Sequence, residues 1–343
     1  MEFGISFIPN DLSSYPKWLA AADSLGFSLI GVPDSQASQY RELNVCLTLA
    51  ALNPSRARFG ALVTCPVARH PAVTADAMAS LMELSGGRVY LGIGIGESAA
   101  YNIGHKPSSL AELEQYALSV KALAAGKPIV YRNAPAVIPW AHFKLPLYLA
   151  GEGPKALALA GRIGDAAVIG LGVTSEAIQT AKARVLVGVQ AAGRDPSAVA
   201  MWWVVRCGVD PDRRRARDYL GSSIAAAAKH VFSGSLEGQS IPEALKGAIQ
   251  LFRERYTYAE HSQVGGGANG RLVRELGLED LFLERFAVAG SPDEVAQQLQ
   301  RIQAFGADRL IIRPMNPDPL SFLRAWEREI VPKLSMSSTG TSM

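Results

Sequence analysis

The sequence has little cysteine. Its three cysteines, Cys46, Cys65 and Cys207, are odd in number, widely spaced and outside any C-x-x-C pattern. A disulfide framework or a zinc site needs paired or closely spaced cysteines, so the sequence predicts neither. The five histidines have no H-E-x-x-H or other metal-binding spacing, so no metal is predicted. Unpaired cysteines favour a reducing compartment, and we expect a cytoplasmic protein.

An excess of one charge is also missing. The chain has 34 Lys and Arg against 31 Asp and Glu, a formal net charge of +3, which argues against a nucleic-acid partner. No apolar run approaches the roughly 18–20 residues that span a membrane. The first nine residues, MEFGISFIP, have no basic segment ahead of their apolar run and do not resemble a secretory signal. We therefore expect neither a nucleic-acid nor a membrane partner.

Short apolar segments alternate with helical segments along most of the chain. Hydrophobic residues make up 48% of the sequence, enough for a large core. Eight such β-α pairs predict a parallel sheet, and eight without a long central reversal predict a closed (β/α)₈ TIM barrel of the α/β class. We expect one domain over residues 1–334. The predicted strands are residues 3–8, 28–32, 58–64, 89–93, 147–149, 166–169, 200–209 and 310–312.

Two segments interrupt this alternation. Residues 127–144 are dotted with proline and predict an excursion with a small hairpin. Residues 211–286 are too long for one crossover helix and contain several helical stretches around the Gly-rich break 265–267. We expect them to form a helical insertion that caps the barrel mouth. The small polar residues 335–343 predict a disordered tail.

The first motif with possible chemistry is LGIGIGES, residues 91–98. Its glycines follow a predicted strand, where glycine lets the backbone approach a flat ligand closely or adopt a positive φ. Glu97 then lies at the carboxyl end of the strand, where barrel enzymes keep their catalytic groups. A tight turn followed by a solvated glutamate fits the pattern equally well.

The second motif is LAGEGPKALALAGRIGDAAVIGLG, residues 149–172. Gly151, Gly153 and Ala156 imitate the G-x-G-x-x-A dinucleotide fingerprint. That fingerprint also needs an acid about 20 residues later to bind a ribose, and this chain has Ile-Gly-Leu-Gly there. A Rossmann dehydrogenase is therefore disfavoured. Two successive Gly-rich strand ends favour a phosphate site of the barrel type instead.

The third motif is LVTCPVARHPAVTA, residues 62–75. Cys65 lies near His70 in the sequence, which could suggest a thiolate pair. Nothing in the sequence orients the histidine, and a free cysteine is more often a small buried hydrophobe. We expect Cys65 to be structural.

Together the motifs VTCPVARHPAVTA, ELSGGRVYLGIGIGES, LAGEGPKALALAGRIGDAAVIG and AGSPDEVAQQLQRIQAFGADRLIIRP resemble the luciferase-like monooxygenase superfamily. The similarity is greatest to its deazaflavin-dependent branch, the coenzyme F-420-dependent methylenetetrahydromethanopterin reductases. It runs from Met1 to about Leu334 and weakens between residues 211 and 286. The resemblance implies a (β/α)₈ barrel whose cofactor binds at the carboxyl ends of the strands.

The resemblance also implies roles for individual residues. Asp34 would line the cofactor site, and Glu97 would work near the substrate. Leu62 and Val63 match a non-prolyl cis peptide that lies against the cofactor ring. The other implied cofactor contacts are Thr64 beside the ring, Gly94 and Gly96 below it, and Gly151, Gly153, Pro154, Gly170, Leu171 and Gly172 around the phosphate.

The chain departs from the family pattern at two positions. Ser35 follows Asp34, where the sugar-phosphate dehydrogenase relatives have a histidine. The proposed base of that reaction is missing, so that activity is disfavoured. Cys65 replaces an asparagine of the reductase branch, which leaves the pterin substrate open.

We predict an oxidoreductase that binds coenzyme F-420, a deazaflavin, or FMN and transfers a hydride to or from a small organic substrate. Glu97 and Asp34 are the predicted catalytic residues. An FMN-dependent two-component monooxygenase and a non-catalytic flavin-binding barrel are the alternatives. With no NAD-binding domain in the sequence, a separate enzyme would have to reduce the cofactor. We also expect a homodimer, because the helices near Asn44 and Pro71 are apolar enough to pair.

Overall fold

The computed structural model describes residues 1–336 except residues 39, 235, 238 and 259–264. The chain forms two compact units. The N-terminal unit consists of Phe3–Val168 and Ala183–Met201, and the C-terminal unit of Met1–Glu2, Ile169–Lys182 and the chain from Trp202 onward. The positions of the units relative to one another are not determined.

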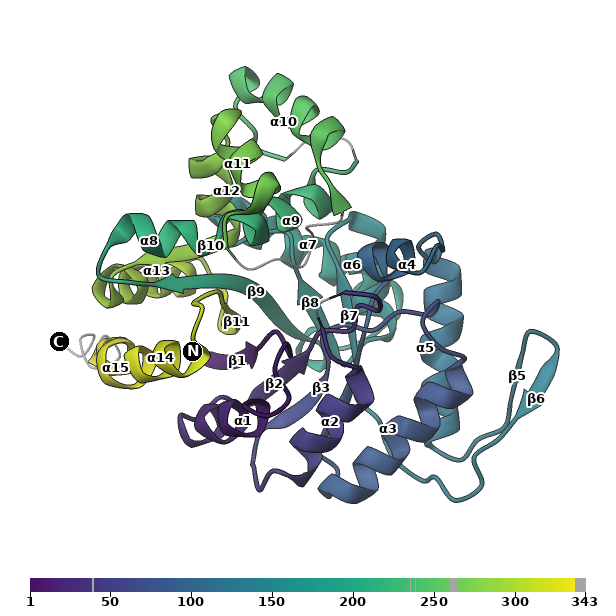
Figure 1. The fold of residues 1–343 in the computed structure, drawn as a ribbon. Helices are drawn as coiled ribbons and strands as arrows, with labels where there is room; N and C mark the ends of the chain where they lie inside the picture. Colours follow the sequence, from purple (N-terminus) through teal and green to yellow (C-terminus); the bar gives the residue numbers. More distant parts are fainter. Residues whose placement is uncertain (39, 235, 238, 259–264, 337–343) are drawn as a thin grey trace. The chain divides into compact units, whose positions relative to one another are not determined.

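Six parallel strands build the sheet of the N-terminal unit (Figure 1). Close backbone packing explains two of its glycines: a Cβ atom on Gly60 would lie 2.1 Å from the carbonyl oxygen of Tyr90, and one on Gly31 would lie 2.6 Å from Leu62 Cδ2. The sheet order is β1 (Glu2–Ser6), β2 (Leu29–Val32), β3 (Arg58–Ala61), β4 (Val89–Ile93), β7 (Leu147–Gly151) and β8 (Ala166–Ile169).

The helices of this unit begin and end where the sequence provides caps. His70 caps the first turn of α3 and Pro71 occupies its first position, while Gly86 in the left-handed conformation ends it. A capping box of Ser109 and Glu112 begins α5. The helices are α1 (Tyr15–Ser24), α2 (Leu43–Leu52), α3 (Pro71–Ser85), α4 (Glu97–Asn102), α5 (Leu110–Ala124), α6 (Pro154–Ile163) and the second half of α7 (Ser175–Ala191).

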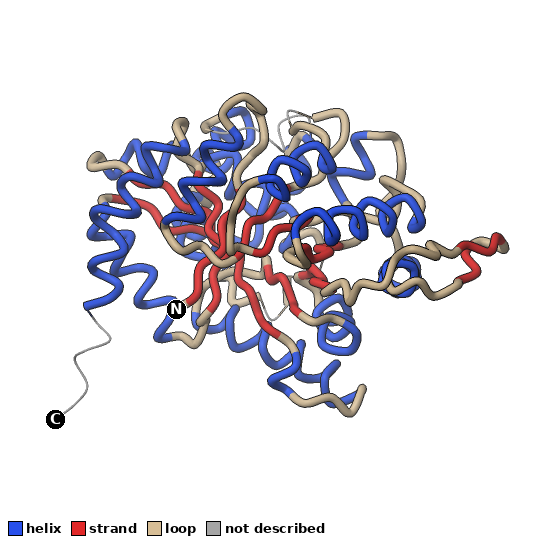
Figure 2. The backbone as a smooth tube through the Cα atoms, turned by 90° about the horizontal axis from the view of Figure 1, so that it is seen from below, coloured by secondary structure: helices blue, strands red, loops and turns tan. Residues whose placement is uncertain are grey.

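The hairpin predicted within residues 127–144 is confirmed. Strand β5 (Ile129–Tyr131) pairs antiparallel with β6 (Ala134–Ala136), and the hairpin projects from the rest of the unit (Figures 1 and 2). Its turn residues, Arg132 and Asn133, have φ values of 48° and 63°, as a two-residue type I′ turn requires. Tyr131 anchors the base of the hairpin by packing its ring against those of His70 and Tyr116.

The C-terminal unit contains β9 (Ala200–Val209) between β10 (Ala287–Gly290) and β11 (Arg309–Pro314), all parallel. Strand β10 is not among the strands expected from the sequence. Its four residues, Ala287–Gly290, follow α12 without an intervening turn, so no local break separates them from the helical segment. Helix α13 (Pro292–Ala304) follows β10, and α14 (Pro319–Ala325) follows β11.

The segment 211–286 is helical, as the sequence predicts. It contains α8 (Arg213–Asp218), α9 (Gly221–Val231), α10 (Glu243–Arg255), α11 (Gly267–Glu275) and α12 (Glu279–Phe286). Its role as a cap stays a prediction. After α14, a π-helical turn at Trp326–Ile330 leads into α15 (Val331–Met336). The first two residues of the expected tail therefore belong to a helix, and residues 337–343 lie outside the described part of the chain.

Candidate active site

Asp34 lies just beyond the carboxyl end of β2, and its carboxylate is surrounded by donors. Its Oδ2 accepts hydrogen bonds from Thr64 Oγ1 and from Arg69 Nη1, both at 2.6 Å. Its Oδ1 accepts from Gln36 Nε2 at 2.6 Å and from Arg69 Nη2 at 3.3 Å. Only 4% of the Asp34 side chain is exposed, so the neighbouring guanidinium compensates a buried charge. The sequence predicts Asp34 at the site but assigns no role to Arg69.

Arg69 connects Asp34 to the start of a helix. Its Nη2 also donates to Glu42 Oε1 at 2.8 Å, and Glu42 caps α2 by accepting from the backbone nitrogen of Val45. Burial lowers the pKa of Arg69, but the hydrogen bonds to Asp34 and Glu42 outweigh burial and raise it overall. The guanidinium is therefore a permanent cation at this site.

Thr64 follows the peptide between Leu62 and Val63, which is cis as the resemblance implies. Strand β3 ends at Ala61, yet Thr64 is still tied to the end of β4. Its nitrogen donates to the carbonyl oxygen of Gly92, and its own carbonyl accepts from the nitrogen of Gly94, both at 3.0 Å. These bonds hold Thr64 at the strand ends beside Asp34.

The loop after β4 has two glycines, Gly94 and Gly96, at positions of close packing. A Cβ atom on Gly94 would lie 3.4 Å from Val63 Cγ2 and 3.6 Å from Ala150 Cβ, so the segments following β3 and β4 and the end of β7 meet here without a side chain between them. Gly96 has a φ of +80°, and a Cβ atom there would lie 2.2 Å from Cys65 Cβ. Glycine is therefore required at position 96 by both conformation and space.

Glu97 is the first residue of α4 and is half-buried. The other end of this short helix is joined to the segment after β2, because Asn102 Nδ2 donates to Ser35 Oγ at 3.2 Å and to the carbonyl oxygen of Gln36 at 3.1 Å. The N-terminal unit thus brings the segments of Asp34, Thr64 and Gly94–Glu97 together.

The surroundings of Cys65 and His70 oppose a thiolate pair. Cys65 is buried, and burial and the negative charge of Asp34 raise the pKa of its thiol, which opposes thiolate chemistry. His70 Nδ1 accepts from the backbone nitrogen of Ala72 as a helix cap. Within the part of the chain that the structure describes, no group of three or more His, Cys, Asp or Glu side chains is arranged to hold a metal ion.

The predicted phosphate loop after β7 has two kinds of glycine. Gly151 packs against α6, since a Cβ atom there would lie 2.6 Å from Ala156 Cβ. Gly153 precedes α6 with φ −76° and ψ 158°, and a Cβ atom there would meet no atom of the described residues within 4 Å. Pro154 begins the helix, and no side chain in the described part of the chain caps its first turn. The N–H groups of that turn suit an anion.

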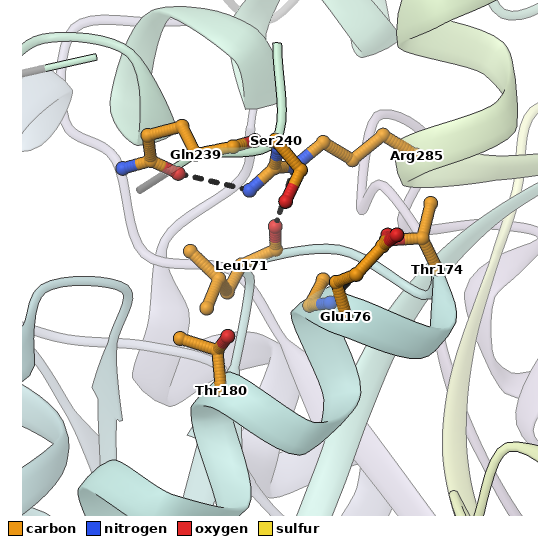
Figure 3. A pocket seen from close by; sticks show the side chains of 8 residues that line it. Leu171, Thr174, Glu176, Thr180, Gln239, Ser240 and Arg285 are labelled. Carbon is orange, nitrogen blue, oxygen red and sulfur yellow. Dashed lines mark hydrogen bonds between the residues drawn. The ribbon is translucent and has the colours of Figure 1, made fainter. Parts of the chain in front are cut away.

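Gly170, Leu171 and Gly172 lie in the C-terminal unit, where the side chain of Arg285 lies beside Leu171 (Figure 3). Arg285 Nε donates to the carbonyl oxygen of Leu171 at 3.1 Å, and its Nη groups donate to Gln239. Gly172 has a φ of +126°, and a Cβ atom there would lie 2.7 Å from Arg285 Cγ. Packing of Arg285 thus explains Gly172. The expectation that this segment shares one pocket with Glu97 stays a prediction.

No helix within the described ranges is long and apolar enough to cross a membrane.

Comparisons with known proteins extend over nearly the whole chain. The family model described as luciferase-like monooxygenase matches residues 5–309. The 5,10-methylenetetrahydromethanopterin reductase of Archaeoglobus fulgidus is 28% identical over 97% of this chain and 100% of its own length. Among solved structures, the coenzyme F-420 dependent tetrahydromethanopterin reductase of Methanopyrus kandleri superposes with a TM-score of 0.77 at 20% identity, covering 97% of this chain and 99% of that one. The oxygenating constituent of 3,6-diketocamphane monooxygenase from Pseudomonas putida, in complex with FMN, gives 0.64 at 18% identity over 97% and 99%.

Proposed function

Because the chain belongs to the luciferase-like monooxygenase family, we propose that it is an oxidoreductase that transfers a hydride between coenzyme F-420 and a small organic substrate. Family membership confirms the predicted resemblance and its (β/α)₈ barrel fold. The choice of deazaflavin rests on the similarity to methylenetetrahydromethanopterin reductases along essentially the full length of both chains, together with the name of the Methanopyrus kandleri reductase, which is described as coenzyme F-420 dependent.

The strand ends of the N-terminal unit suit a flat cofactor ring. The ring would lie near the loop that contains Gly94, and Thr64 and Asp34 would border it. The open space at Gly153 and the uncapped first turn of α6 would accept the phosphate. When bound, the reduced cofactor supplies the hydride, and the protein positions it and excludes water. Gly170, Leu171 and Gly172 are proposed as further phosphate contacts.

Glu97 is the proposed proton donor or substrate anchor. It begins α4 directly after the Gly94–Gly96 loop, and α4 is fixed to the segment that carries Asp34. A carboxyl group in this position can hold a proton near the reacting atoms of the substrate. Arg69 and Thr64 hold Asp34 in place, so its part in the proposal is structural support of the cofactor site.

Two partners belong to the proposal. A separate enzyme would reduce the coenzyme, because the sequence lacks the ribose-binding acid of a dinucleotide fold. A second copy of the chain would pack on α2 and α3, which expose the apolar side chains of Val45, Leu52, Val73 and Leu84. Sedimentation showing a stable monomer at micromolar concentration would contradict the dimer. The three free cysteines fit the expected cytoplasmic location.

An FMN-dependent monooxygenase is the second candidate, favoured by the similarity to the oxygenating constituent in complex with FMN. The two candidates differ in what the reduced enzyme needs. We would titrate the purified protein with coenzyme F-420 and with FMN, then mix the reduced complex with a panel of small metabolites with and without dioxygen.

Anaerobic oxidation of reduced coenzyme F-420 by a metabolite supports the proposal. Turnover that needs both FMN and dioxygen supports the monooxygenase instead. Binding without turnover under any condition supports a non-catalytic flavin-binding barrel.

A further inference from the structure

The carboxylate of Asp34 has no acceptor capacity left for a ligand. A carboxylate offers about four lone-pair sites on its two oxygens. Asp34 accepts two hydrogen bonds from Arg69, one from Thr64 and one from Gln36. Four donors therefore occupy four sites. A group so occupied would have to break an existing bond before it could exchange a proton with a substrate.

Arg69 joins three segments that border the site. It immediately precedes the cap of α3, it binds Asp34 beyond β2, and it binds Glu42 at the start of α2. Its side chain is 16% exposed, so most of this bridge is withdrawn from water. The planar guanidinium supplies donors in a fixed fork, a geometry that lysine cannot reproduce.

The hydrogen bonds to Asp34 also fix its two polar neighbours. Thr64 Oγ1 uses its hydrogen on Asp34, so the oxygen retains only acceptor capacity. Gln36 Nε2 also donates to Asp34, which turns its amide oxygen away from the carboxylate. Among the described residues, that oxygen is buried and has no hydrogen-bond partner. Both neighbours are therefore fixed as acceptors, which match the N–H and O–H donors of a ligand.

We propose that Arg69 is the positioning residue of this site: it holds Asp34, and through Asp34 it fixes Thr64 Oγ1 and Gln36 Oε1 as acceptors for an N–H or O–H donor of the bound coenzyme. Asp34 then organises the site and does not transfer protons, in place of the catalytic role expected from the sequence. The inference rests on the proposed function, because a flavin or deazaflavin ring carries such a donor.

The test compares Arg69→Ala with Arg162→Ala. Arg162 is a matched control: it makes a bidentate pair with Glu114 at 2.6 and 2.7 Å in the same unit, in the last turn of α6, away from the helix start that borders the proposed phosphate site. The probe is whichever of coenzyme F-420 and FMN the wild type binds. Its dissociation constant is measured with and without millimolar guanidinium chloride, alongside the thermal unfolding temperature.

We expect Arg69→Ala to raise the dissociation constant at least tenfold, guanidinium to recover most of that loss, and Arg162→Ala to stay within twofold of wild type in both conditions. Recovery by guanidinium distinguishes positioning from general destabilisation. Should Arg69→Ala fail to fold, Arg69→Lys keeps the charge without the fork and is expected to lose affinity three- to tenfold at an unchanged unfolding temperature.

An Arg69→Ala protein that binds as Arg162→Ala does, or whose loss guanidinium leaves unchanged, overturns the inference alone. If Arg69→Ala does not fold and Arg69→Lys is used instead, wild-type affinity in Arg69→Lys overturns the inference. A wild type that binds neither coenzyme overturns the proposed function, and the inference with it.

Discussion

The loop after β4 and the loop after β7 share a G-x-G pattern, and each leads directly into a helix, yet their glycines serve different purposes. Gly96 is confined by Cys65 and by a left-handed φ, and its helix begins with Glu97. Gly153 has an ordinary extended conformation with open space around it, and its helix begins with Pro154. Contact with Cys65 and the backbone conformation together explain why position 96 is a glycine. No packing contact among the described residues explains Gly153, and we attribute its open side to the phosphate of the proposed coenzyme.

The largest expected effect concerns Glu97, the acid with which the helix after the β4 loop begins. Glu97→Gln should lower the rate of hydride transfer by a factor of about 10²–10⁴, because a general acid contributes about that much. Coenzyme affinity should stay within twofold of wild type, since the backbone surface is unchanged. Stopped-flow oxidation of the reduced coenzyme measures the rate. A normal rate with weakened coenzyme binding would make Glu97 a binding residue.

A second prediction concerns the confinement of Gly96. Gly96→Ala should lower the free energy of unfolding by about 2–4 kcal/mol, combining a left-handed alanine with overlap on Cys65. Cys65→Gly in the same chain should remove the overlap and make the two changes non-additive. Denaturant unfolding measures both. Simple additivity would show that contact with Cys65 is not what restricts position 96.

A third prediction separates Asp34 from Glu97. Asp34→Asn should weaken coenzyme binding about three- to tenfold, because hydrogen bonds to charged groups contribute about 1.5–3 kcal/mol and the amide retains only part of them. The pH dependence of the rate should not change, because hydrogen bonds from Arg69, Thr64 and Gln36 already fill the acceptor sites of the Asp34 carboxylate. Loss of one limb of the pH profile in this variant would return Asp34 to a catalytic role.

The smallest expected effect concerns the reactivity of the Cys65 thiol. Because burial and the charge of Asp34 raise the pKa of Cys65, its thiol stays protonated through neutral pH. The reactive thiolate forms only as the pH rises above this increased pKa. Alkylation of the native protein by iodoacetamide at pH 7 should be much slower than that of an exposed thiol, and a peptide map would identify the modified cysteine. Rapid labelling of Cys65 would contradict the structural role.

The parts of the fold and of the candidate site that depend on local sequence patterns could be predicted from the sequence. The helices from Pro71 and Pro154, the hairpin and the loop glycines all depend on neighbouring residues, so the sequence revealed them. The role of Arg69 and the contact of Arg285 with Leu171 depend on pairs 35 and 114 positions apart. No local pattern records such pairs. The only available signal for Arg69 was indirect: a buried carboxylate at a strand end requires a cation.

The central claim is that the open space at Gly153 belongs to the coenzyme phosphate, and a titration tests it most directly. Gly247 in α10 is a suitable control, because a Cβ atom there also meets none of the described residues within 4 Å and its φ is ordinary. Both Gly153→Val and Gly247→Val should remain folded. We expect Gly153→Val to bind coenzyme F-420 or FMN at least a hundredfold more weakly than wild type and Gly247→Val to bind normally. Wild-type affinity in folded Gly153→Val would contradict the account.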